Sequence, residues 1–277
     1  MYCKSCIFLK QMGYFLMMTI AVLFVAVNVT AVSAEEKRNE NSGWEFQAAP
    51  YLWFISMDGD VKVKGQKSDV DASFSDIWDE LNVAAMVAFE GRKDRWGFYG
   101  DIIYANLGNT ATVDRIRIEP DINALWLTAG GFYRLGTWDL SDASTNDVST
   151  VTVDVVGGAR YTYLDIELDF KNLPLPDISG DKDWVDPLIG ARAIFDLSER
   201  WALSLDGSIG GFGVGSDFAW NAAGLMGYRF GLFGKDNATV FGGYRAMYQD
   251  YTDGSGNDKF EWDVTLHGPI LGLAIQF

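Results

Sequence analysis

The amino-acid sequence predicts an all-β fold: a transmembrane antiparallel up-and-down β-barrel of about ten strands, with eight or twelve as alternatives. Three observations predict it. Apolar and polar residues alternate over many segments, the links between these segments are short and long in turn, and aromatic residues gather near the ends of the apolar faces.

Ten segments carry the alternation that is typical of half-exposed strands. They are residues 44–55, 82–92, 95–107, 121–135, 149–166, 184–197, 200–212, 218–230, 237–250 and 260–277. Residues 92–95, 198–200 and 231–236 are expected to form tight turns. The links 56–81, 107–120, 167–183, 213–217 and 251–259 are mostly longer and acidic or glycine-rich. Short periplasmic turns opposite long, acidic extracellular loops are typical of outer-membrane barrels, although the link 136–148 is long for a periplasmic turn.

The two faces of each predicted strand differ in chemistry. In segment 200–212, Trp201, Leu203 and Leu205 alternate with Ser204 and Asp206. A soluble barrel would turn the apolar face inward, and alternation alone leaves that alternative open. Aromatic residues near the strand ends favour a membrane barrel, in which the apolar face meets lipid.

The N-terminus has the layout of a cleaved secretory signal. Lys4 and Lys10 precede an apolar run over residues 14–29, and Val32-Ser33-Ala34 supplies small residues for cleavage. The alternative is a membrane anchor, but this run is short for a helix that must cross roughly 30 Å of hydrocarbon. We therefore expect a signal peptide over 1–34, a short periplasmic segment over 35–43 and the barrel over 44–277.

Composition narrows the classes of partner. Cleavage removes Lys4 and Lys10 from the 22 basic residues and none of the 38 acidic ones, so the net charge changes from −16 to −18. A chain this acidic is not expected to bind nucleic acid. Both cysteines, Cys3 and Cys6, lie in the signal, so no disulfide is expected in the mature chain.

If the apolar face meets lipid, the charges on the opposite face line the barrel interior. Alternation and charge select a candidate network: Glu90, Arg92, Asp101, Asp154, Arg160, Asp186, Arg192, Asp196, Asp206, Arg229 and Arg245. One interpretation is that arginine–carboxylate pairs fill the interior and hold the barrel closed. The other is a charged constriction that selects solutes. Both need the same residues.

Other motifs are weaker candidates for chemistry. The single histidine, His267, has Asp263 four residues away, and any Ser-His-Asp triad would have to include it. Barrel enzymes have their catalytic groups at the outer rim, whereas His267 is expected within the membrane band, so we predict that the chain is not an enzyme. The acidic loop 250–258 lacks the register of a calcium loop and is interpreted as a solvated turn. Gly210–Gly215 opens no helix, so a turn explains it better than a nucleotide site. No metal or cofactor is expected.

The first long loop contains a possible helix. Its segment Ser73–Leu81 is predicted to form one or two helical turns with Ser75 as the N-cap. Two placements stay open: the helix folds inward as a partial plug, or it lies at the membrane interface.

Several longer motifs resemble an uncharacterised family of Gram-negative outer-membrane β-barrel proteins. They are Trp44-Glu45-Phe46, Tyr51-Leu52-Trp53, WVDPLIGAR (184–192), GGFGVGSDFAW (210–220), Gly243-Tyr244-Arg245 and GPILGLAIQF (268–277). The resemblance covers nearly the whole mature chain. It implies an outer-membrane address and insertion by the barrel-assembly machinery, which would read the C-terminal aromatic strand Leu271–Phe277. It implies no activity and no functional residues.

The sequence therefore predicts a monomeric outer-membrane barrel with a narrow, charge-filled interior and a structural or surface-interaction role. Expected partners are membrane lipid, lipopolysaccharide and divalent cations at the acidic loops. The alternatives are a small porin-like diffusion channel and, less favoured, an enzyme with an active site at its rim.

Overall fold

The computed structural model describes residues 43–63, 66–108, 111–113, 116–140, 149–170, 178–232 and 234–277. The predicted signal peptide, 1–34, and nearly all of the predicted segment 35–43 lie outside them. Among the residues described, no helix is long and apolar enough to cross a membrane.

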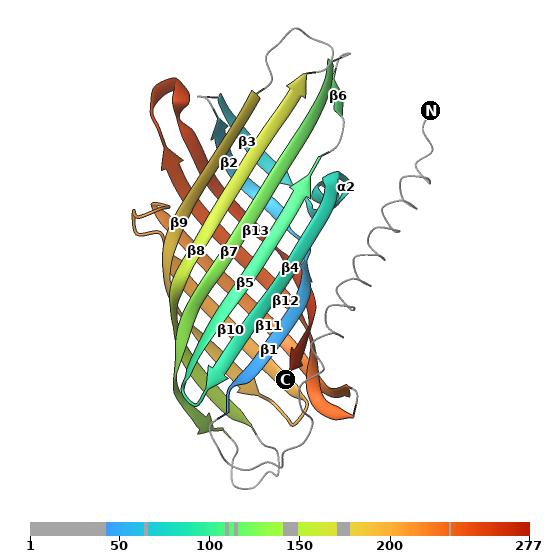
Figure 1. Ribbon diagram of the computed structural model, residues 1–277, viewed down its shortest axis with the longest axis vertical. Coiled ribbons are helices and arrows are strands. Elements are labelled where there is room, and N and C mark those ends of the chain that lie inside the picture. Colours follow the sequence, from blue (N-terminus) through green and yellow to red (C-terminus); the bar gives the residue numbers. More distant parts are fainter. Residues whose placement is uncertain are drawn as a thin grey trace, which may run out of the picture. The chain divides into compact units, whose positions relative to one another are not determined.

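Ten antiparallel strands close a barrel (Figure 1), as the sequence predicted. Each strand pairs with the next, and β1 pairs with β13, where Tyr51 lies opposite Gly272. The wall consists of β1 (Glu45–Trp53), β4 (Leu81–Lys93), β5 (Trp96–Leu107), β7 (Ile116–Asp139), β8 (Thr150–Phe170), β9 (Ile178–Asp196), β10 (Trp201–Gly210), β11 (Phe218–Leu232), β12 (Lys235–Asp253) and β13 (Phe260–Gln276). Each corresponds to one predicted segment.

The predicted loop 56–81 is wrong in detail because it contains regular structure. β2 (Ser56–Val63) and β3 (Gln66–Ala72) form a hairpin, and α2 (Phe74–Glu80) follows it. β2 pairs with β13 from Glu261 to His267, and β1 pairs with β13 from Ile270 to Gln276. Both strands therefore lie along the same edge of β13, one after the other. Met57 and Val61 show the alternation that marks β2, but acidic residues around them obscure it.

The wall has unequal height at the end that carries the long loops. β8 and β9 pair as far as Leu168 and Ile178, two and six residues beyond the predicted segments, and the short β6 (Ala111–Val113) pairs with β7. A 3-10 turn, η1 (Gly256–Asp258), lies between β12 and β13. The β10–β11 hairpin is low by comparison, since β9 and β10 pair only as far as Leu188 and Gly210.

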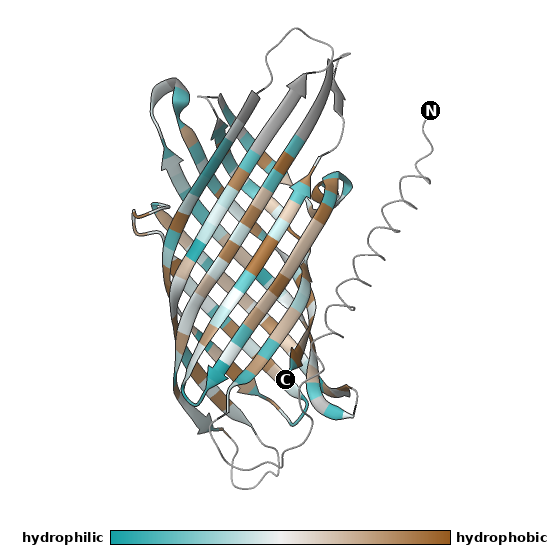
Figure 2. Ribbon diagram, in the orientation of Figure 1, coloured by the Kyte–Doolittle hydropathy of each residue, from teal (hydrophilic) through white to brown (hydrophobic). Residues whose placement is uncertain are grey.

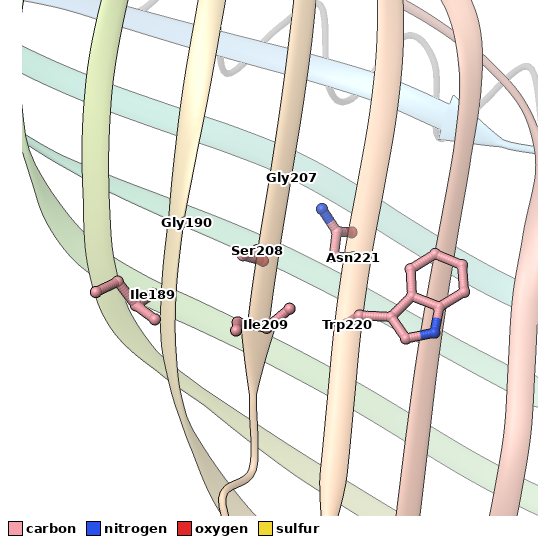
Figure 3. A pocket seen from close by; sticks show the side chains of 7 residues that line it. All are labelled: Ile189, Gly190, Gly207, Ser208, Ile209, Trp220 and Asn221. Carbon is pink, nitrogen blue, oxygen red and sulfur yellow. The ribbon is translucent and has the colours of Figure 1, made fainter.

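Apolar side chains cover the outer face of the strands. Ile189, Leu205, Ile209 and Leu271 are each about half exposed, between 45 and 53 %. Brown and teal alternate along the ribbons (Figure 2), as expected when successive side chains point to opposite faces. A shallow depression in the wall of β9, β10 and β11 is lined by Ile189, Ile209 and Trp220 around Gly207 (Figure 3).

The interior differs from the predicted charge-filled lumen because it also holds an apolar core. Trp53, Trp126, Trp184 and Trp262 are only 4–6 % exposed and belong to one cluster. Phe260, Val264 and Leu266 of β13 join it from the half that pairs with β2. Alternation finds the inward face, but it does not separate an inward tryptophan from an outward one.

Candidate functional site in the barrel interior

Glu90, Arg192, Asp154 and Arg134 form a chain of ion pairs across the interior. Arg192 donates to Glu90 Oε2 at 2.5 Å and to Asp154 Oδ2 at 2.8 Å. Asp154, which is fully buried, also accepts from Arg134 Nε at 2.9 Å. The guanidinium of Arg192 lies 4.8 Å from the centre of the Phe132 ring. The buried charge of Asp154 is therefore compensated by two arginines.

Arg245 forms a second centre with Asp101. Its Nη1 donates to Asp101 Oδ2 at 2.8 Å, and Tyr51 donates its hydroxyl to the other oxygen at 2.6 Å. Arg245 Nε donates to Asn221 at 2.9 Å, and the guanidinium lies 5.0 Å from the Trp53 ring. These contacts join β1, β5, β11 and β12.

Asp186 is held by neutral donors rather than by an arginine. The amide and hydroxyl of Ser216 donate to it at 2.6 and 2.9 Å, Gln249 Nε2 donates at 2.9 Å and Trp184 Nε1 at 3.2 Å. Ser216 lies in the β10–β11 loop, so this carboxylate fastens that loop to β9. The glycine-rich segment is thus a turn, with Gly211 and Gly213 at φ values of +84° and +72°.

Arg160 and Asp206 are the least satisfied charges of the candidate set. Arg160 is 2 % exposed; its Nε donates to Thr128 at 3.3 Å, and its Nη1 has no partner among the described residues. Asp206 accepts one long bond, from Asn221 Nδ2 at 3.4 Å. The sequence placed both in the interior but did not predict that they would lack an ion-pair partner among the residues that the structure describes.

The remaining candidates lie towards the short turns. Arg229 pairs with Asp196, and Arg92 pairs with Glu45, which the sequence had not singled out. Arg134, Tyr51, Gln249 and Ser216 were also missed. Arg134 shares its strand face with Thr128 and Phe132, so alternation within segment 121–135 contained the signal that could have found it.

Several side chains inside the barrel are almost completely buried. Among the described residues, eight of them come from wall strands and the ninth, Ser216, from the β10–β11 loop: Arg160, Ile103, Met247, Gln249, Val264, Thr162, Asp154, Asp186 and Ser216. Gln249 links opposite walls, since it accepts from Trp126 and donates to Thr162, each at 2.9 Å. By contrast, the side chains of Glu90, Arg192 and Arg134 are 18–25 % exposed, so water reaches part of the charged layer.

His267 lies outside the interior, and its partner is Asp58 rather than Asp263. His267 Nε2 is 2.5 Å from Asp58 Oδ2, and its Nδ1 is 2.5 Å from the Tyr244 hydroxyl. A neutral ring satisfies both bonds if Nε2–H donates to Asp58 and Nδ1 accepts from Tyr244. The three side chains cross-link β2, β13 and β12.

The candidate plug helix lies at the rim. Ile77 packs against the apolar core, whereas no residue of α2 is buried and Trp78 is 37 % exposed. The N-cap is Ser73, not the predicted Ser75. Its amide and hydroxyl donate to Asp76 at 3.0 and 2.6 Å, and these bonds lower the pKa of the Asp76 carboxyl.

The acidic segment 250–258 ends β12 and forms the 3-10 turn. Lys182 Nζ lies 2.6 Å from Asp253 Oδ2, and this ammonium lowers the pKa of the Asp253 carboxyl. Within the described ranges, no three His, Cys, Asp or Glu side chains are grouped so as to hold a metal ion.

No protein-family model and no curated protein matches the chain, so its membership of the family that it resembles stays a prediction. Solved structures similar to it are bacterial outer-membrane barrels. The attachment invasion locus protein Ail of Yersinia pestis is 13 % identical over 86 % of this chain and 100 % of its own, with a TM-score of 0.35. Neisserial surface protein A is 12 % identical over 86 % and 100 %, with a TM-score of 0.30.

The translocator domain of the autotransporter NalP from Neisseria meningitidis is 10 % identical over 97 % of this chain and 98 % of its own, with a TM-score of 0.34. Such distant similarity carries no information about an activity or a partner of this chain.

Proposed function

We propose that this chain is an integral outer-membrane β-barrel with a closed interior, serving a structural or surface-interaction role rather than conducting solutes. The observation that supports it best is the set of almost completely buried side chains that the wall strands turn inward, among them Arg160, Met247 and Gln249. A pore needs a continuous water-filled path, and close-packed side chains remove one.

The outer surface supports the membrane address. Isoleucine and leucine are half exposed along the outer face. Trp96 with Tyr133 and Trp201 with Tyr228 make ring contacts near the short turns, and Trp220 with Tyr248 lies towards the long loops. Two aromatic belts that flank an apolar band suit the two interfaces of a bilayer.

The proposed partners follow from this address. Lipid and lipopolysaccharide would surround the wall, and the barrel-assembly machinery would read Leu271–Phe277. Divalent cations at the acidic loops would bridge lipopolysaccharide phosphates, and the barrel would act as a monomer. We assign no catalytic role to His267 because its bonds tie three strands together.

Planar-bilayer recording tests the closed interior. We expect no steady conductance from the purified wild-type chain. A variant with Trp126→Ala and Gln249→Ala, which lacks two side chains that bond across the interior, is the positive control and should conduct. Steady wild-type conductance would contradict the closed barrel and favour a small diffusion channel, which the partly exposed charges of Glu90 and Arg192 would then line.

A further inference from the structure

The N-terminal part of β9 has a free main-chain edge, and the proposed function gives this edge no role. β10 accompanies β9 only as far as Leu188, and the amide of Gly211 then donates to the Pro187 carbonyl at 3.1 Å. Beyond Pro187, the loop between β10 and β11 still covers the edge, because Gly215 lies against the Val185 carbonyl and Ser216 binds the Asp186 carboxylate. From Trp184 to Ile178, within the part of the chain that the structure describes, the strand has main-chain pairing to β8 on its other side only. An unpaired edge of this length presents a row of amide and carbonyl groups that can pair with another strand.

The C-terminal end of β12 lies next to this part of β9. The contacts between the two strands are made by side chains alone. Trp184 stacks on Tyr251 with ring centroids 4.2 Å apart and an interplanar angle of 4°. Lys182 Nζ lies 2.6 Å from Asp253. These contacts support the edge from the interior, because Trp184 is buried, and they use none of its main-chain groups.

The charges around the edge are strongly one-sided. Asp181 and Asp183 are exposed on β9, and Asp253 of β12 lies against Lys182 of β9. Lys182 is the one cation between Gly180 and Pro187, and Asp253 already neutralises it. A second copy of this chain would bring the same acids to the contact, so repulsion disfavours pairing between copies.

We propose that the edge of β9 from Ile178 to Trp184 is a docking site for an extended, basic segment of a partner protein, which adds to the sheet as a strand. In this mode, main-chain hydrogen bonds supply affinity and alternate side chains supply specificity. Basic residues of the segment meet Asp181 and Asp183 on the outer side, and apolar ones pack towards Trp184 and Tyr251. The proposal rests on the surface-interaction role and names the partner's chemistry.

A labelled ten-residue peptide of alternating lysine and valine, capped at both ends, is the probe, and the full chain in phosphatidylcholine nanodiscs is the receptor. We expect saturable binding, at least tenfold tighter than to empty nanodiscs. Hydrogen exchange should slow at least tenfold at those amides of Ile178–Trp184 that do not bond β8.

The controls separate strand addition from simple charge attraction. The same peptide with every amide N-methylated keeps its charge but donates no main-chain hydrogen bond, so its binding should be lost. Asp181→Asn with Asp183→Asn should weaken binding about tenfold, whereas Asp79→Asn with Glu80→Gln in α2, an equal change of charge at another exposed place, should leave it within twofold.

No saturable binding, equal binding of the methylated peptide, or slowed exchange elsewhere than β9 would each overturn the proposal. Conductance is measured independently. A conducting wild type with an intact peptide response would reject the closed barrel alone, and a silent barrel without peptide binding would reject the docking site alone.

Discussion

Asp154 is a charged side chain with no surface exposed to solvent. Its ion pairs with Arg134 and Arg192 should therefore contribute more to stability than ion pairs on the surface do. Arg192→Ala removes the bond to Asp154 at 2.8 Å and the pair with the partly exposed Glu90, but leaves Arg134 at 2.9 Å from Asp154. We expect this single change to destabilise the barrel by about 1–3 kcal/mol, the effect of losing a hydrogen bond to a buried charge. Removing Arg134 as well leaves the carboxylate unpaired and should raise the loss to about 3–5 kcal/mol.

Urea-induced unfolding of the chain in lipid vesicles measures this difference. Arg92→Ala is the matched control: it removes an arginine whose partner Glu45 is 62 % exposed, so its effect should stay below about 1 kcal/mol. Equal, small losses for all three variants would mean that the charged layer is wet.

Residue identity and alternation placed Glu90, Asp154 and Arg192 inside, but they missed Arg134 and did not give the partner of any of these charges. Glu90 and Arg192 are brought together by the curvature of the closed wall, across 102 positions of sequence. The donors to Asp186 come from a loop and from β12, which alternation within β9 does not encode. Pairing depends on barrel diameter and on strand stagger, and neither can be read from one strand.

Neighbouring glycines on β12 give a test of packing between strands. A Cβ added at Gly243 would lie 2.0 Å from the Gly224 carbonyl oxygen, whereas one added at Gly242 would meet nothing closer than 3.5 Å. Gly243→Ala must therefore push β11 and β12 apart, and we expect a loss of about 1–3 kcal/mol in the same unfolding assay. Gly242→Ala is the control, with a change below about 0.5 kcal/mol. Equal effects would show that the close approach at Gly243 does not limit stability.

The helix α2 should depend on Ser73 and on pH. Ser73→Ala removes the hydroxyl bond to Asp76, so amide exchange within Phe74–Glu80 should speed up about fivefold, as expected for a lost N-terminal cap. Because the folded pKa of Asp76 is lowered, its contribution is complete above the ordinary carboxyl pKa and is lost as the pH falls through the lowered value. Exchange at neutral and acidic pH checks both; Ser75→Ala, which leaves the Asp76 bonds in place, is the control.

The ten wall strands could be predicted because each turns one apolar face outward over many residues. The β2–β3 hairpin could not, because its residues Asp58, Asp60, Asp69 and Asp71 are those of an acidic loop. The hairpin is held in a regular β conformation because β2 pairs with β13, which lies some 200 positions away in sequence. In this pairing Ser56 is opposite His267. Local propensity is a weak guide where a distant strand supplies the hydrogen bonds.

At the scale of the whole molecule, large aromatic side chains lie on both faces of the barrel wall. Tryptophans lie in the buried cluster inside and in the belts outside, so the contrast between faces is smaller than the alternation suggests. What distinguishes the sides is charge: Asp154, Arg160 and Asp186 are buried within, and along the outer face of β10, Leu203, Leu205 and Ile209 carry none. A charge introduced on the outer face is thus the most direct probe of what surrounds it.

Leu205→Arg places a cation midway along β10, on a side chain that is 45 % exposed. In water this change is nearly neutral, because a half-exposed position lets the guanidinium stay hydrated. In hydrocarbon it should destabilise the barrel by about 2–4 kcal/mol. Leu140→Arg, at a 53 % exposed position beside the short turns, is the matched control and should cost at most about 1 kcal/mol, since charge is tolerated near the interface. Folding into vesicles from urea measures both variants, and equal small effects would mean that the outer face meets water.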